Sequence, residues 1–166
     1  VFNSKMWVIG GYGGTARNDV WSSPDGITWT QETAAAAFSA RYGQDSAVFA
    51  GKMWVIAGSN GPFLNDVWSS LDGITWTQET AAAAFPIRAY QAVQVHGGKM
   101  WVMGGYFGGT NYRSDVWSSP DGITWTLENG TPGFLPRAQV GSSDFGGSLW
   151  VLGGLTGAAR GDVWSS

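Results

Sequence analysis

Cysteine is absent from this chain of 166 residues, and His96 is its one histidine. Without thiols the chain has no disulfide bond, no thiol nucleophile and no zinc–thiolate site. A single histidine argues against a histidine-based metal centre, because such sites combine several imidazole or carboxylate ligands. We therefore expect neither a metal nor a cofactor.

Charge is also scarce, with 9 Lys and Arg against 12 Asp and Glu and a net charge of -3. No basic stretch is available to neutralise a row of phosphates, so nucleic acid is not an expected partner. No apolar run approaches the roughly 20 residues that span a bilayer, so membrane insertion is not expected. No signal segment precedes Val1, as in a mature or trimmed chain.

Glycine and tryptophan are abundant, with 26 and 11 residues, and the tryptophans follow a repeat. Lys-Met-Trp-Val-Ile begins at Lys5 and returns at Lys52, 47 residues later. Further copies begin at Lys99 and, altered, at Ser148, and Asp-Val-Trp-Ser-Ser follows each copy. A period of this size indicates stacked structural repeats. Residues that recur in every copy are expected to fill the core, and this includes all the tryptophans.

One period contains four segments of strand character, which in the second copy are residues 44–49, 52–57, 66–70 and 75–79. The second segment is apolar almost throughout, as in a strand covered on both faces. In the fourth, Ile74 and Trp76 are predicted to face one side, as in an outer strand with one wet face. Ala50-Gly51 and Leu71-Asp72-Gly73 are predicted to form the tight turns. No segment has a helical period of useful length.

The repeat resembles the kelch-repeat β-propeller. The resemblance depends on an arginine before the first strand (Arg41, Arg88, Arg137), a glycine pair closing the second (Gly10-Gly11, Gly104-Gly105, Gly153-Gly154) and the tryptophan of the fourth. The second copy departs from it with Ala57-Gly58, and tryptophan replaces the tyrosine that kelch repeats commonly carry in the third strand. The resemblance covers essentially the whole chain.

The resemblance implies an all-β fold of four-stranded antiparallel blades, with about three and a half blades in this chain. We expect a single domain over 1–166, divided into a partial blade at 1–31, blades at 32–79 and 80–127, and a partial blade at 128–166. Propellers have four to eight blades and leave no long edge unpaired. Further blades from a longer chain are therefore the leading expectation, and a ring closed by a homo-oligomer is the alternative.

Two other motifs are read as structure. Ser23-Pro24-Asp25-Gly26-Ile27-Thr28-Trp29 is similar to the Asp-box hairpin of sialidase-type propellers but lacks one residue between aspartate and glycine. The Asp-box stabilises a fold and implies no catalysis. Gly11 to Ala16 has the spacing of a dinucleotide-binding loop, but it leads into a strand, so no helix N-terminus is available for a pyrophosphate.

Candidate binding residues lie where the copies differ. In an antiparallel blade, the loop after the second strand and the connection to the next blade emerge on one face, where variable loops commonly bind ligands. All five tyrosines and all six arginines are expected there, and this pair is enriched at binding hot spots. The predicted ligand-binding residues are Tyr12, Arg17, Arg41, Tyr42, Phe63, Arg88, Tyr90, Tyr106, Phe107, Tyr112, Arg113, Arg137 and Arg160. For Arg41, Arg88 and Arg137 the resemblance implies a place at the central opening, and bonding of backbone carbonyls between blades is the alternative.

The predicted function is a non-enzymatic interaction module that binds a protein segment or a glycan, outside the cell or at its surface. One alternative is a segment of an extracellular glycan-acting enzyme whose catalytic residues lie elsewhere, since no residue of this chain is predicted to be catalytic. The other alternative is a structural repeat of a surface or filament assembly.

Overall fold

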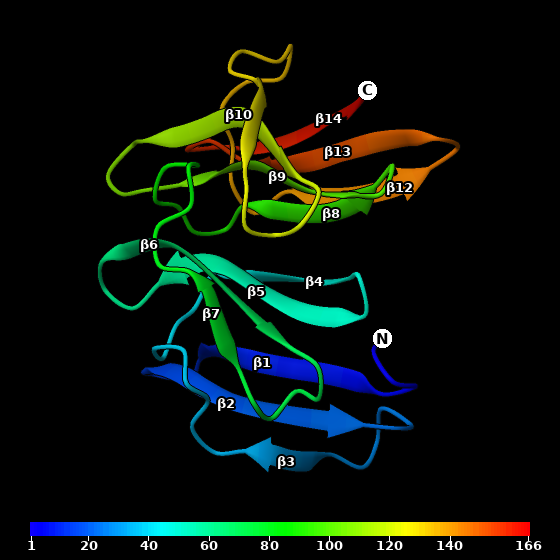
Figure 1. Cartoon of the computed structure of the whole chain (residues 1–166). Coiled ribbons are helices and arrows are strands. Elements are labelled where there is room, and N and C mark those ends of the chain that lie inside the picture. Colours follow the sequence, from blue (N-terminus) through cyan, green and yellow to red (C-terminus); the bar gives the residue numbers. More distant parts are fainter.

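The computed structural model describes residues 1–166, in which fourteen strands and no helix form four antiparallel sheets (Figure 1). The strands are β1 (Met6–Tyr12), β2 (Ala16–Ser23), β3 (Thr30–Thr33), β4 (Asp45–Phe49), β5 (Lys52–Ser59), β6 (Phe63–Ser70), β7 (Thr77–Thr80), β8 (Ala92–His96), β9 (Lys99–Tyr106), β10 (Tyr112–Ser119), β11 (Thr126–Asn129), β12 (Gly141–Phe145), β13 (Ser148–Leu155) and β14 (Ala159–Ser165). The predicted absence of helices is confirmed.

Each sheet is one copy of the repeat, and the four sheets follow one another in chain order from blue to red in Figure 1. The two middle sheets have the strand orders β4-β5-β6-β7 and β8-β9-β10-β11. The first sheet contains β1-β2-β3 and the last β12-β13-β14. These up-and-down sheets pack face to face, as consecutive blades of a partial β-propeller do. The predicted fold class is confirmed.

The innermost strands β4, β8 and β12 of successive sheets lie beside one another. Side chains join them: Val93 N–H donates to an Asp45 carboxylate oxygen at 2.8 Å, and His96 Nδ1 lies 3.1 Å from Asp144 Oδ1. His96 is thus held by a carboxylate at the end of its strand. The inner strands form the wall around which the blades are arranged.

In a complete blade, tight turns join the first strand to the second and the third to the fourth, at the end opposite the long loops. Ala50 and Gly51, between β4 and β5, both have positive φ (50° and 73°), as a two-residue hairpin turn requires. In the next turn, an Asp72 carboxylate oxygen accepts the N–H groups of Ile74 and Thr75, each within 2.8 Å. Both predicted turns are present. We call the face formed by these turns the turn face.

The core lies between adjacent blades, and the repeated tryptophans fill it. Trp76 packs edge-on against Phe38 with ring centroids 5.2 Å apart, and Trp125 packs on Phe85 at 5.0 Å. Each of these pairs belongs to a cluster of buried apolar side chains contributed by two neighbouring sheets. The equivalent Trp29, on the outer face of the first sheet, is 38% exposed, whereas Trp76 and Trp125 are 5% exposed.

The outermost strand differs from its predicted form. The strand begins at Thr77, so Ile74 and Trp76 belong to the preceding turn instead of alternating along it. Ile74 is about half exposed and Trp76 is buried, because the turn folds the indole under itself, with Nε1 donating to Gly73 O at 3.2 Å. The prediction that these two side chains share one environment was wrong.

Ala57→Gly is expected to raise the free energy of unfolding by about 0.5–1 kcal/mol. Ala57 has φ of 56°, close to the values of Gly10, Gly104 and Gly153 at the same repeat position. A Cβ makes this left-handed conformation costly, and glycine removes the strain. Urea titration would measure the gain. Ala47→Gly in β4 is the control, and it is expected to lose stability. A loss of stability at both positions would contradict the view that Ala57 is strained.

Stability is expected to fall as the pH drops below about 4. Hydrogen bonds from the backbone, first that of Thr75, lower the pKa of Asp72, and Lys52 lowers the pKa of Glu79. A carboxyl whose pKa is lowered by folding stabilises the protein above its unfolded pKa and loses this contribution as the pH falls through the folded value. Burial raises the pKa of Asp45, which acts in the opposite sense. Urea midpoints at several pH values would measure the trend, and Asp72→Asn should reduce it; a flat profile would contradict it.

Candidate functional site

The long loops of the blades and the connections between blades form the face opposite the tight turns. We call it the loop face. It comprises the hairpin loops together with the strand ends beside them, at 12–18, 59–65, 106–114 and 155–161, and the connections 34–44, 81–91 and 130–140. Each connection is paired with two blades. Arg41 N–H donates to Arg17 O of the first sheet at 2.8 Å, while Tyr42 and Ser59 exchange two backbone bonds of 2.9 Å. The backbone of the loop face is therefore a continuous hydrogen-bonded surface.

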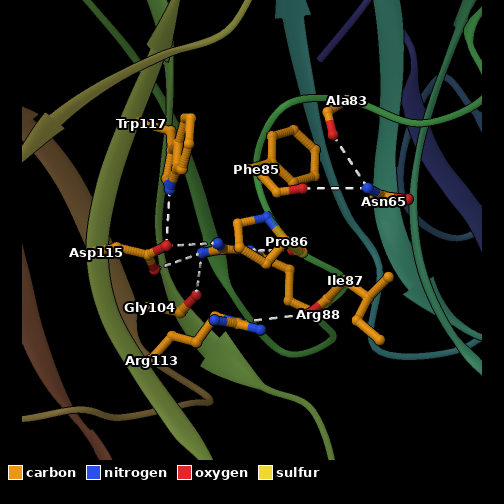
Figure 2. Close-up of polar contacts among 10 residues, drawn as sticks. All are labelled: Asn65, Ala83, Phe85, Pro86, Ile87, Arg88, Gly104, Arg113, Asp115 and Trp117. Carbon is orange, nitrogen blue, oxygen red and sulfur yellow. Dashed lines mark hydrogen bonds and ion pairs between the residues drawn. The ribbon is translucent and has the colours of Figure 1, made fainter. Parts of the chain in front are cut away.

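Three of the predicted ligand-binding arginines, Arg41, Arg88 and Arg137, are fully buried under this face. Arg88 shows the arrangement (Figure 2): both terminal nitrogens bind the Asp115 carboxylate, at 2.9 and 2.8 Å. Its remaining contacts are to the carbonyls of Pro86 and Gly104 at 3.0 and 2.8 Å. Arg41 binds Asp66 and Arg137 binds Asp162 in the same way. The structure places these arginines in the framework, with their side chains out of reach of a ligand.

The glycine pair at the end of the second strand, which the second sheet replaces with Ala57-Gly58, makes room for this framework. At Gly104, with φ of 64°, a Cβ would lie 2.7 Å from the carbonyl oxygen of Arg137. The next residue, Gly105, donates its N–H to the same oxygen at 2.8 Å. The pair therefore lets the following connection approach the strand end closely, which fixes the position of the loop face on the blades.

Five tyrosines form a tract across the loop face. Tyr12 and Tyr42 meet edge to face with ring centroids 5.3 Å apart, and Tyr42 and Tyr90 follow at 6.3 Å. Farther along, Tyr106 and Tyr112 lie 5.3 Å apart. We call Tyr12, Tyr42, Tyr90, Tyr106 and Tyr112 the tyrosine tract. Phe63 extends it, at 5.5 Å from Tyr106.

Two depressions lie along the tract, one on each side of Tyr90. The larger, about 400 Å³, is lined by Gly11, Tyr12, Tyr42, Gly43 and Tyr90. The smaller, about 160 Å³, is lined by Tyr90, Tyr106, Tyr112, Ala138, Gln139 and Leu155. Three tyrosine rings line each depression, together with two glycines in the larger one. Such shallow, aromatic surfaces suit a flat ligand group stacked on a ring.

Tyr90 lies at the centre because of its backbone. It has φ of 58°, as Gly43 (64°) and Gln139 (53°) have at the same position of the neighbouring connections. Tyr90 N–H donates to Gly43 O at 2.6 Å and Gln139 N–H to Tyr90 O at 2.8 Å, so these residues join successive blades. Burial, with smaller effects of Tyr42 and Tyr106, raises the pKa of Tyr90.

The other three predicted arginines share one repeat position on the loop face. Arg17, Arg113 and Arg160 each pair across their hairpin with the second glycine of the pair, and Leu64 takes this place in the second sheet. Arg17 and Arg160 are exposed and Arg113 is half-buried. The three guanidinium groups are outside the buried ion pairs.

Arg113 is the most firmly held of the three. Its guanidinium lies 4.0 Å from the ring centroid of Phe107 and its Nε donates a long bond of 3.4 Å to Ile87 O (Figure 2). Partial burial, then the neighbouring Arg88, lower the pKa of Arg113, and Asp115 opposes them. A stacked guanidinium is oriented in advance for two-pronged contact with an anion.

Charge is divided between the two faces. All six arginines lie on the loop face, where the carboxylates of Asp66, Asp115 and Asp162 are bound by the buried arginines. The glutamates Glu32, Glu79 and Glu128 bind Lys5, Lys52 and Lys99 beside the start of the second strand, at the opposite ends of the blades. Asp25, Asp72, Asp121 and Asp144 also lie on the turn face. The loop face is consequently the less acidic one.

The sheets, their order and the backbone hydrogen bonds that join the blades at the loop face define a β-propeller domain. Residues 23–136, more than half of the chain, match the family described as the DUF6242 beta propeller domain, and the chain belongs to this family. No curated protein matches the chain.

Some features of the site were missed by sequence reasoning. Gln139 and Gly43 line the depressions although neither is an exposed aromatic or cation. The shared position of Arg17, Arg113 and Arg160 is visible in the sequence once the two-residue insertion in the third copy is allowed for. The burial of Arg41, Arg88 and Arg137 follows from aspartates 25 to 27 residues away, which recur with them in each copy.

Proposed function

We propose that this propeller is a non-enzymatic interaction module that binds a protein segment or a glycan through the tyrosine tract. The tract is the observation that supports it: five tyrosines from four loops and connections lie on one face, and Tyr12 remains 68% exposed. Exposed aromatic rings combine large contact area with a polar hydroxyl and few rotatable bonds, which favours binding. The resemblance of the repeat to kelch propellers, which bind ligands through the equivalent loops, supports the same face.

The test replaces Tyr112 and Arg113 together with alanine. Tyr112 supports the end of the tract, because Gly157 N–H donates to its hydroxyl at 3.2 Å. On an array of peptides and glycans, the variant is expected to lose at least about tenfold in affinity for any ligand captured by the unchanged protein. Phe145→Ala is the control, since Phe145 is an exposed aromatic of the turn face. Equal binding by both variants would refute the site.

The outer faces of the terminal sheets favour a second candidate, a repeat that packs against further blades. Met6, Val8 and Trp29 are exposed on the first sheet, whereas the equivalent Met53 and Val55 are buried between sheets. At the other end, a cavity of about 360 Å³ lies between the third and fourth sheets and is lined by Met103, Phe134, Val151 and Trp164, among others. Phe134 has the repeat position of Phe38 and Phe85, which hold Trp76 and Trp125.

The exposed face of the first sheet fits a further blade, and the cavity fits an aromatic side chain at the place that Trp76 and Trp125 take in the middle sheets, from a longer chain or from a second copy. Measurement of the mass in solution distinguishes these sources. An assembly of copies that dissociates when Trp29 is replaced with glutamate would support the second; a monomer whose natural flanking sequence supplies more repeats would support the first. A monomer without such flanking repeats would contradict both.

A further inference from the structure

We propose that the ligand of the loop face is an anionic polysaccharide, whose sugar rings pack on the tyrosine tract and whose carboxylates or sulfates bind Arg17, Arg113 and Arg160. This inference rests on the proposed function and specifies its ligand.

The arginines of the loop face favour an anionic ligand. Three blades present an arginine at one register position, opposite Gly11, Gly105 or Gly154, so the cations recur along the loop face. The nearby aspartates Asp66, Asp115 and Asp162 are already bound by the buried arginines, and Asp19 accepts a hydrogen bond from the Trp21 indole. The guanidinium groups of Arg17 and Arg160, which are exposed, and of Arg113, which is half-buried, lie outside these ion pairs and can bind anions of a ligand. Arg–anion pairs are strong because they are charge-assisted and two-pronged.

The distribution of charge over the two faces also favours an anionic ligand on the loop face. The protein is acidic overall, with a net charge of -3, but its lysine-bound glutamates and turn aspartates lie on the turn face. An anionic chain is thus repelled from the turn face and attracted to the loop face, which orients its approach.

The tyrosine tract favours a glycan over an acidic peptide. A peptide commonly adds a strand to a free sheet edge or inserts side chains into apolar pockets. The connections of the loop face have no free edge, since Arg41 and Tyr42 are bonded to the blades on both sides. The two depressions are shallow and walled by phenol rings. A pyranose ring instead offers an apolar C–H face for stacking and hydroxyls for the tyrosine oxygens.

A proline-rich peptide also packs between aromatic rings, but recognition of its basic residues uses acidic groups of the receptor. Arg17, Arg113 and Arg160 give this face the opposite sign.

The experiment measures affinity by calorimetry at low and high salt. The probes are oligogalacturonate, its methyl-esterified form, a sulfated oligosaccharide, oligoglutamate of matched charge and a proline-rich peptide. Oligogalacturonate or the sulfated sugar should bind at least about tenfold more tightly than the esterified sugar, and salt should weaken the binding. Comparison of oligogalacturonate with the sulfated oligosaccharide distinguishes recognition of carboxylates from recognition of sulfates.

Two substitutions in opposite directions make the assignment specific. Arg113→Ala is expected to lower affinity for the anionic sugar about tenfold. Leu64→Arg places a fourth arginine at the shared position and is expected to raise it several-fold, which misfolding would not do. Lys52→Ala, which removes a cation from the turn face, is the control and should have little effect.

The outcomes separate this inference from the proposed function. Equal binding of the esterified and charged sugars, or preferred binding of either peptide, through the tyrosines would overturn the anionic-glycan inference and leave the binding module intact. Loss of affinity in Tyr112→Ala together with the expected effects of Arg113→Ala and Leu64→Arg would support both. No binding of any probe would overturn the inference; if broader peptide and glycan arrays also capture nothing, the proposed function fails with it.

Discussion

Trp125→Ala should lower the free energy of unfolding by about 3–5 kcal/mol, the range for removing a large buried aromatic. Trp125 belongs to a cluster of ten buried residues between the second and third sheets, and its ring meets Phe85 nearly at right angles. Its indole also donates to Gly122 O at 3.2 Å, so the hairpin before β11 loses a support. Alanine would leave a cavity that the rigid neighbouring sheets cannot fill. Urea unfolding followed by far-ultraviolet circular dichroism measures the loss.

Trp29→Ala is the matched control, because it removes the same side chain from the same turn at an uncovered face. Its indole makes the equivalent bond, to Gly26 O at 3.3 Å. The expected loss is at most about 1 kcal/mol, from partial burial alone. Similar losses at Trp29 and Trp125 would show that the turn, and not the packing between blades, determines the contribution of these tryptophans.

Arg88→Ala is the second large effect, with an expected loss of about 3–5 kcal/mol. It leaves the Asp115 carboxylate, 15% exposed, without its cation, and the carbonyls of Pro86 and Gly104 lose a donor. The penalty is mainly that of a charge left in a poorly hydrated site. Thermal and urea unfolding measure it, and Arg113→Ala, which removes a half-buried arginine without an ion-pair partner, should change stability by no more than about 0.5 kcal/mol.

Two comparisons give this prediction its control. Arg88→Ala combined with Asp115→Ala should cost less than the sum of the single changes, with a coupling of about 1–3 kcal/mol. Arg137→Ala should cost less than Arg88→Ala, because its partner Asp162 is 40% exposed and water can replace the guanidinium. Additive single losses would mean that the ion pair contributes nothing specific.

The repeat made most of the framework predictable. Alternating turn signals and apolar strands placed the sheets, and the recurrence of every tryptophan indicated the core, because only packing between like units requires one large residue at one position. The ends of β7 were less predictable: Trp76 has high strand propensity, but its turn hydrogen bond and its burial against Phe38 place it before the strand.

The candidate site was predictable only in outline. Tyrosine and arginine on variable loops indicated the face on which the tyrosine tract lies, but an arginine in the sequence does not reveal whether its side chain is exposed. Arg17 and Arg41 lie in neighbouring, paired segments, yet one is exposed and the other is buried because Asp66 reaches it. The left-handed backbone of Tyr90 gives no sequence signal at all, since tyrosine rarely adopts it.

The backbone links through Gly43, Tyr90 and Gln139 have a consequence for how such a protein can change its specificity. These links use N–H and carbonyl groups, so the bonds that join the blades do not depend on the identity of the three side chains. Different side chains already occupy the same conformation in adjacent repeats, although a Cβ at Gly43 would lie 3.1 Å from the Tyr90 ring. The centre of the face is thus a set of positions at which different side chains can be presented. Duplicated repeats can diverge there, and an engineer can exchange residues there, while the blades stay joined by the same main-chain bonds.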